Sequence, residues 1–288
     1  MQATIVTPKT TDLPSAVYAQ DGLLWQPSVL ARGPWDARAQ HGGAPSALLV
    51  HLAESAMTEP GWQLTRLSIE LIKPVPVAPL AVRQELHAAR STTRMTLELY
   101  ADDILVARAH ALLLRGQPFA LPAQTPGWTA ARLLPLPQDC TERLRIPGLP
   151  EGTAFHTAAV ESRVAQGDPS QPGAASAWFR LRVPLVQGQP SSPAMRAAAA
   201  ADFGNGLSWV LPAERYLFAN ADMSLHLHRA PQGEWIGVAS QTQADGSGAG
   251  TTLSQLYDEH GPVGVAVQSL VLRERGAPAA TPPATPAA

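Results

Sequence analysis

The stretch HGGAPSALLVHLAESA at residues 41–56 decides how the chain is interpreted. Two glycines lead directly into a run in which apolar residues recur at roughly helical spacing. Pro45 suits the first turn of a helix, because the N–H that it lacks would have no partner there. Pro60 and Gly61 then stop the run. The stretch is therefore either the backbone oxyanion loop of a serine esterase or the buried start of a packing helix.

A second helix is predicted in SSPAMRAAAAADFGNG, residues 191–206. Ser192 can cap it, Pro193 fits its first turn, and Gly204 can end it. Strand-like runs surround both helices. They are residues 16–37, which form one or two strands, and residues 64–72, 80–89, 94–100 and 104–114 around the first helix, and residues 153–164, 177–183, 217–228, 234–244, 251–257 and 263–272 around the second. The pattern predicts an α+β chain in which a helix followed by an antiparallel meander occurs twice.

The two halves also resemble each other in amino-acid sequence. LSIELIKP (67–74) matches MSLHLHRAP (223–231), and LVARAHALLLR (105–115) matches VGVAVQSLVLR (263–273). The offsets, 224 − 68 = 156 and 273 − 115 = 158, agree within a short insertion. We therefore expect a fused pair of like domains.

We place the first domain at residues 15–115 and the second at residues 151–275. Between them, residues 116–150 carry seven prolines and little periodicity, which is typical of a linker or a wrapping segment. The low-complexity tail, residues 276–288, is expected to be disordered.

The composition argues against several classes of function. The formal net charge of -2 gives no reason to expect nucleic acid or an anionic membrane as a partner. A single cysteine, Cys140, rules out an internal disulfide and a cysteine-rich zinc site. No stretch is long enough to span a bilayer, and the first residues have no apolar core of signal-peptide length. We expect a soluble cytoplasmic protein.

The esterase interpretation fails on a second motif. An α/β-hydrolase also needs a nucleophile elbow, G-x-S-x-G, between a strand and a helix. The nearest match is GLSWV at residues 206–210, which lacks the second glycine. The chain also does not alternate strand and helix as a parallel sheet requires. We therefore expect Gly42 and Gly43 to let a helix start lie close against another backbone.

Polar residues in apolar surroundings are the candidates for chemistry. Asp202 lies at the C-terminal end of the second helix, where the helix dipole disfavours a carboxylate. Its pKa should therefore rise, which suits a general base, although the spacing alone favours a solvated aspartate at a helix end. Gln268 is a lone amide in an apolar strand, where it either makes structural hydrogen bonds or holds a water. Asn220 is a third polar side chain in a strand-like run.

Two histidines, His226 and His228, lie on one face of a predicted strand. A metal site would need further Asp, Glu or His ligands, and no matching cluster is apparent elsewhere in the sequence. We interpret the pair as half-buried polar residues of the strand.

Taken together, HGGAPSALL, ADFGNG, FANADMSLHLHR, EWIGVASQT and GVAVQSLVLR resemble the acyl-CoA thioesterases with a double hot-dog fold, namely the thioesterase II group and its thioesterase-like relatives. The order and spacing of the motifs carry this resemblance over nearly the whole chain. It implies that each half is a central helix wrapped by an antiparallel sheet, and that the two sheets join edge to edge. Residues 41–56 would then be the first central helix.

The resemblance also implies a site. The family's catalytic residues are an Asp at the end of the second helix, a Ser or Thr on the strand that follows, and a Gln on the last strand. Asp202 matches the first and Gln268 the third, while Asn220 puts an amide where the family has a hydroxyl. These residues would orient and deprotonate a water that attacks the thioester of acyl-CoA, with the acyl chain in an apolar tunnel. No metal or other cofactor is implied, and two such chains could associate as a homodimer.

Two alternatives share the same fold. A hot-dog hydratase would need a paired Asp and His in a D-x-N-P-x-H-like loop, and Asp222 and His226 lack both that spacing and the Asn-Pro. A non-catalytic acyl-binding protein stays open because Asn220 departs from the family pattern.

The repeat alignment bears on the number of sites. In this alignment Gln268 falls on His110, Asn220 falls on Leu64, and Asp202 falls near Glu54. Because a leucine cannot position water, we predict one working site, in the second half of the chain.

Overall fold

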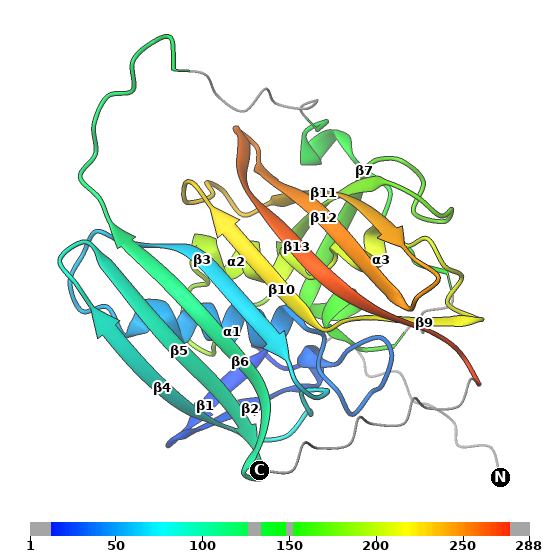
Figure 1. Ribbon diagram of the computed structural model, residues 1–288, viewed down its shortest axis with the longest axis horizontal. Coiled ribbons are helices and arrows are strands. Elements are labelled where there is room, and N and C mark those ends of the chain that lie inside the picture. The colour runs from blue at the N-terminus through cyan, green and yellow to red at the C-terminus, as the bar shows by residue number, and fades with distance from the viewer. Residues whose placement is uncertain (1–12, 126–133, 148–151, 277–288) are drawn as a thin grey trace.

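The computed structural model describes residues 13–125, 134–147 and 152–276. Within them, one large sheet of antiparallel strand pairs covers a layer of helices (Figure 1). Its strands are β1 (Tyr18–Asp21), β2 (Leu24–Pro27), β3 (Trp62–Leu71), β4 (Leu80–Ala88), β5 (Thr92–Ala101), β6 (Ile104–Arg115), β7 (Val160–Gln166), β8 (Ala175–Leu181), β9 (Tyr216–Asn220), β10 (Asp222–Leu227), β11 (Ile236–Ala244), β12 (Ala249–Asp258) and β13 (Gly261–Glu274). The helical segments are η2 (Val29–Ala31), α1 (Gly43–Ser55), η3 (Pro137–Asp139), η4 (Phe155–Ala159), α2 (Pro193–Ala201) and α3 (Gly204–Leu207).

The strand order keeps the two halves of the chain apart. It runs β1-β2-β4-β5-β6-β3-β10-β13-β12-β11-β8-β7, and β9 pairs with β13 beside this path. The first six strands belong to the first half of the chain and the rest to the second. Within this strand order the halves therefore meet at one strand pair, β3 with β10, and the expected edge-to-edge junction is confirmed. Joining the sheets in this way removes two exposed strand edges that would otherwise invite aggregation.

The junction lies on an approximate two-fold axis. Ser68 of β3 pairs directly with Ser224 of β10, and the Ser224 hydroxyl donates to the Ser68 Oγ atom over 3.1 Å. These two serines are equivalent residues of the repeat, at the offset of 156 positions that the letters predict. Because Ser68 meets its own counterpart, and the flanking pairs Leu67–Leu225 and Ile69–Met223 exchange equivalent positions, the two halves are related as the subunits of a symmetric dimer would be.

The two central helices lie antiparallel against each other. Near the end of α1, Glu54 accepts a hydrogen bond of 2.6 Å from the hydroxyl of Ser192, which caps the start of α2. At the opposite ends, a Cβ atom on Gly43 would lie 2.5 Å from the carbonyl oxygen of Ala199. No side chain fits there, so the glycine of the HGG stretch allows the close approach of two backbones that we expected.

One predicted strand is divided into two. The run at 217–228 breaks at Ala221, between β9 and β10, and both pieces pair with β13. The Ala221 N–H donates to the Ser269 carbonyl over 2.8 Å, while the Ser269 N–H donates to the Asp222 carboxylate over 2.7 Å. A side chain therefore replaces a backbone acceptor at the break, which alternating hydrophobicity cannot reveal.

A second prediction is wrong at its first half. Residues 153–164 do not form one strand, because Phe155–Ala159 form the π-helical turn η4 and only Val160–Gln166 are extended. The hydroxyl of Thr157 accepts from the Ala154 N–H over 3.0 Å and donates to the carbonyl of the same residue. These local side-chain bonds offer the backbone an alternative to the sheet, and they hold Phe155 fully buried.

Residues 134–147 of the proline-rich segment pack against the second half, whereas residues 116–125 are exposed. Leu134 and Cys140 pack with Trp178 and Trp235 in a small apolar cluster. The Trp178 indole N–H also donates to the Pro135 carbonyl over 2.7 Å. Residues 126–133 and 148–151, and the predicted disordered tail beyond Gly276, lie outside the described residues. The domain boundaries stay a prediction.

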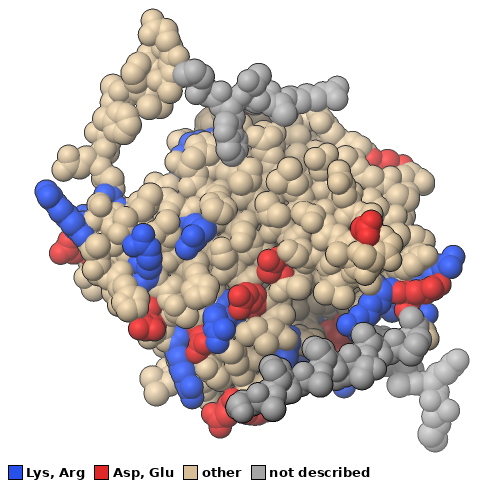
Figure 2. Space-filling view, in the orientation of Figure 1, with Lys and Arg blue, Asp and Glu red and all other residues tan. Residues whose placement is uncertain are grey.

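The outer face of the sheet carries few charged side chains over β10, β12 and β13 (Figure 2). Leu253, Val267 and Val271 are large apolar side chains exposed on these strands. The homodimer stays a prediction. No helix of the described residues has the length and apolarity needed to cross a membrane.

Candidate active site

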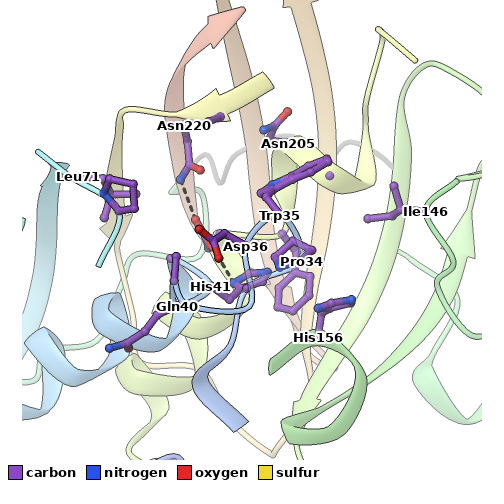
Figure 3. Close-up of a pocket in the computed structure, with 18 of the residues that line it drawn as sticks. Pro34, Trp35, Asp36, Gln40, His41, Leu71, Ile146, His156, Asn205 and Asn220 are labelled. Atoms are coloured by element: carbon purple, nitrogen blue, oxygen red, sulfur yellow. Dashed lines mark hydrogen bonds and ion pairs between the residues drawn. The ribbon is translucent and has the colours of Figure 1, made fainter. Parts of the chain in front are cut away.

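A cavity of about 880 Å³ lies where the two halves of the chain face each other. The first half contributes residues between 33 and 42, before α1, and residues 71–75, after β3. The second half contributes residues 143–146, the turn after α2 and part of β9. Figure 3 shows side chains from both halves pointing into this space. A site here needs both halves of the chain.

The lining of this cavity combines apolar and cationic side chains. Its apolar side chains include Trp35, Leu71, Ile146 and Leu217. Its cationic side chains, all exposed, are Lys73, Arg143, Arg145 and Arg273. The cavity therefore suits a ligand that has an apolar part and an anionic part.

Asp202 is held on several sides at the floor of the cavity. It forms the C-cap of α2, and only 6% of its side chain is exposed. The side-chain amide of Asn220, at the end of β9, donates to its Oδ1 atom over 2.8 Å (Figure 3). The Nδ1 atom of His41, in the loop before α1, lies 2.8 Å from its Oδ2 atom. The structure thus brings Asp202 and Asn220 together, and it adds a histidine from the other half of the chain.

The expected rise in the pKa of Asp202 is wrong. Burial does raise this pKa, but His41, the Asn220 amide and the Gly43 N–H outweigh burial and hold the pKa below its usual value. The carboxylate ends α2, yet it faces the start of α1, where backbone N–H groups favour an anion. Asp202 is therefore ionised at neutral pH.

Gln268 contacts Asp202 on the side that faces away from the cavity. It is fully buried on β13 and does not line the cavity. Its amide nitrogen lies 3.4 Å from the Asp202 carbonyl oxygen and 3.5 Å from Oδ1, and its Oε1 atom accepts from the Asn205 N–H over 3.1 Å. This geometry fits a residue that positions Asp202 better than one that holds a water.

Gly204 allows the turn after α2 to lie directly on the sheet. A Cβ atom there would lie 2.3 Å from the Ser254 Oγ atom and 3.1 Å from the Gln268 Oε1 atom. We expected this glycine to end the helix, but α3 begins at it. Its missing side chain instead lets Gln268 approach the turn that carries Asp202.

Two histidines of the site escaped the sequence analysis as functional residues. His41 belongs to the stretch that predicts the first helix. Its position directly before Gly42 and Gly43 is the only sequence feature that could have marked it as a site residue. A Cβ atom on Gly42 would lie 2.8 Å from the Asp202 Oδ1 atom, so the glycine makes room for the carboxylate. His156, on η4, lines the cavity and stacks on His41 with 6.3 Å between ring centroids. No sequence pattern marked His156, because it lies in the turn that was predicted as a strand.

The corresponding place in the first half has a different chemistry. By the strand ladders, Leu64 pairs with Leu113 as Asn220 pairs with Leu270, so Leu64 does occupy the position of Asn220. The expected match of His110 with Gln268 is wrong. Ser68 pairs with His110, whereas Ser224 pairs with Val267, so the equivalent of Gln268 is the buried Ala111. His110 instead lies exposed, within 3.3 Å of the Thr96 hydroxyl.

The residues of the hydratase alternative do not meet in this cavity. Asp222 accepts the Ser269 N–H, and His226 is exposed. Neither lines the cavity. Among the residues that the structure describes, no group of three or more His, Cys, Asp or Glu side chains could hold a metal ion.

Comparison with protein families gives two matches. The model of the acyl-CoA thioesterase N-terminal domain matches residues 31–114, and the model of the acyl-CoA thioesterase C-terminal domain matches residues 137–272. A search of curated protein sequences finds no match.

Solved structures share the fold. A protein described as a thioesterase from Novosphingobium aromaticivorans is 22% identical, with a TM-score of 0.71, over 89% of this chain and 98% of its own. A conserved protein with a hot dog fold from Alicyclobacillus acidocaldarius is 17% identical, with a TM-score of 0.67, over 90% and 96%. The acyl-CoA thioesterase II TesB2 from Mycobacterium marinum is 16% identical, with a TM-score of 0.63, over 90% and 96%.

The double hot-dog expected from the sequence is therefore the fold of this chain. The two family models together cover both of its halves, in the order N-terminal domain and then C-terminal domain. The chain belongs to the acyl-CoA thioesterase family and is a thioester hydrolase.

Proposed function

We propose that the chain hydrolyses acyl-CoA to a free acid and CoA in the cavity floored by Asp202. The observation that carries this proposal is an ionised carboxylate, oriented by the Asn220 amide, at the floor of a cavity of about 880 Å³. A water beside Asp202 and Asn220 attacks the thioester carbonyl carbon. As the water attacks, it gives up a proton to the site; the carbon–sulfur bond then breaks, and the leaving CoA thiolate takes up that proton. Gln268 holds Asp202 in place from behind.

The charges of the cavity fit the two ends of this substrate. CoA carries phosphate groups, and Lys73, Arg143, Arg145 and Arg273 place positive charge along the exposed part of the lining. The apolar side chains of the same cavity suit an acyl group.

The first test is release of free thiol from a panel of acyl-CoA chain lengths. Asp202→Asn should keep the fold and lower kcat by ~100-fold or more, as expected when the carboxylate on which activation of the water depends is lost. Asp245→Asn is the matched control, because Asp245 is an exposed residue in the turn that follows β11 and does not line the cavity. Near-normal turnover by Asp202→Asn would show that this carboxylate is structural. Binding of acyl-CoA by the wild type without thiol release would favour a non-catalytic acyl-binding protein.

A second test addresses the cationic side chains. Arg145→Glu and Arg273→Glu should each raise KM for acyl-CoA several-fold, because they reverse a charge that faces the phosphates. The same variants should leave KM nearly unchanged for the matching acyl thioester of N-acetylcysteamine, which has no phosphates. Equal changes for both substrates would argue against this placement of CoA.

A further inference from the structure

His41 and Asp202 form a buried pair that joins the two halves of the chain. Only 9% of the His41 side chain and 6% of the Asp202 side chain are exposed, and their nearest atoms, Nδ1 and Oδ2, are 2.8 Å apart. His41 also lines the cavity. The imidazole is therefore held by the carboxylate on one side and lies against the substrate space on the other (Figure 3).

The pair fixes which nitrogen of His41 carries the proton. Two lone pairs cannot face each other at 2.8 Å, and Asp202 is ionised, so Nδ1 carries a proton and donates it to the carboxylate. The Gly43 N–H also points at this Nδ1 atom over 3.1 Å and reaches the Asp202 carboxylate as well; with Nδ1 protonated, the acceptor that remains for this N–H is the carboxylate. The lone pair of Nε2 is then free. Within residues 13–125, 134–147 and 152–276, no hydrogen bond engages Nε2.

Asp202 is the poorer proton acceptor of the two groups. Its Oδ1 atom accepts from the Asn220 amide, and its Oδ2 atom accepts from His41. A proton arriving at either oxygen would have to displace one of these donors in a buried site. Donors of this kind stabilise the anion and oppose its protonation.

The surroundings hold the imidazole and contain few other charges. The rings of Phe203 and Phe155 lie with centroids 4.5 Å and 5.2 Å from that of His41. Among the described residues, the titratable groups that face His41 are Asp202 on α2 and His156 on η4. Arg143 acts on His156 from the wrapping segment. A positive charge on His41 during the reaction would therefore meet the Asp202 anion directly.

We propose that His41 is the general base of the reaction and that Asp202 is its positioning carboxylate. This inference rests on the proposed function. The His41 Nε2 atom takes a proton from water as the water oxygen bonds to the thioester carbonyl carbon. When the tetrahedral intermediate collapses, the carbon–sulfur bond breaks, and the proton on Nε2 passes to the departing thiolate. One water is consumed, one acid and one thiol are formed, and His41 returns to its starting state.

The decisive variant is His41→Asn. The asparagine amide nitrogen can occupy the place of Nδ1 and keep the donor to Asp202, but nothing replaces Nε2. If His41 is the base, kcat should fall by ~100-fold or more, and the acid limb of the wild-type pH profile should disappear. His110→Asn is the matched control, since His110 is exposed on the outer face of the sheet. If His41→Asn keeps kcat within about ten-fold of wild type with the same acid limb, Asp202 itself is the base and the proposal is wrong.

A measurement on the wild type covers the case in which the variant does not fold. Nitrogen-15 NMR of the labelled protein at neutral pH should show His41 with its proton on Nδ1. A proton on Nε2 alone would overturn the proposal whatever the activity. If the wild type releases no thiol from any acyl-CoA, the proposed function fails, and the NMR result still decides whether the Asp202–His41 pair has the geometry of a base.

Discussion

His156 presents a neutral imidazole to the cavity. Burial lowers its pKa to about 4, with further contributions from His41 and Arg143. Its buried Nδ1 atom has no hydrogen-bond partner among the described residues. A side chain in this state can meet a polar group of a ligand without adding charge beside His41.

The lowered pKa of His156 makes stability depend on pH. Between pH 6.5 and about 4 the unfolded chain binds a proton at this residue, whereas the folded chain does not. The free energy of unfolding should therefore fall as pH falls from 7 to 5, by at most about 2 kcal/mol from this group. In urea unfolding at both pH values, His156→Gln should lose less stability than wild type over this interval. An identical loss in the two proteins would mean that His156 titrates normally.

At the scale of residues, the sequence could indicate where the chemistry lies but not how it is tuned. Asp202, Asn220 and Gln268 were found through the family pattern, and the structure brings them together. The predicted direction of the pKa shift of Asp202 is wrong because the prediction rests only on the dipole of the helix that Asp202 ends. The donors that lower this pKa include His41 and Gly43, which lie about 160 positions away in the sequence and reach Asp202 only through the fold.

At the scale of elements, the contact of α1 with α2 sets the position of the site. The helices can approach closely because α2 is rich in alanine and α1 begins with glycine. Gly43 lies against the carbonyl oxygen of Ala199, only one turn before Asp202. A shift of α1 would therefore move His41 relative to Asp202.

Gly43→Ala tests this contact. The added Cβ atom would lie 2.5 Å from a backbone oxygen, which cannot move without α2. We expect a loss of ~1–3 kcal/mol in the free energy of unfolding, as for overpacked sites, together with a lower kcat. Gly116→Ala is the control, because no atom lies within 4 Å of the Cβ that it would add. Equal stability of the two variants in denaturant titrations would show that the helices can separate without cost.

The elements themselves were largely predictable, since both central helices and most strands follow apolar periodicity. The two failures, at residues 153–164 and 217–228, share one cause. In each, a short polar side chain, Thr157 or Asp222, bonds to the backbone and interrupts a pattern that otherwise favours a strand.

At the scale of the whole molecule, the two halves share a fold but not a chemistry. Glu54 lies in the last turn of α1, as Asp202 lies at the end of α2, yet its partner is the Ser192 hydroxyl. Burial raises the pKa of Glu54, and the hydrogen bond from Ser192 only partly opposes this. Leu64 and Ala111 stand where the second half has Asn220 and Gln268. We therefore keep the prediction of one working site.

Paired variants test the single site. Glu54→Gln should keep kcat within about two-fold of wild type, because it lies apart from the cavity residues. At neutral pH it should be no less stable, since the amide keeps an acceptor for Ser192 and removes a buried charge. Gln268→Ala should lower kcat sharply, because Asp202 loses a support in a buried site. Comparable losses of kcat in both variants, with folding intact by circular dichroism, would mean that both halves contribute to the chemistry.

The hydrogen bond between Ser68 and Ser224 has a consequence for how such a protein can evolve. In a dimer of identical chains, this contact would join a residue to its own copy, and every mutation in the gene would appear twice in the assembly. Here the two partners are separate codons, so each can change alone. In the fused chain, the first half can therefore have Leu64 and Ala111 at the positions of Asn220 and Gln268 while the second half keeps both polar residues. In a homodimer of single hot-dogs, the same substitutions would change both sites at once.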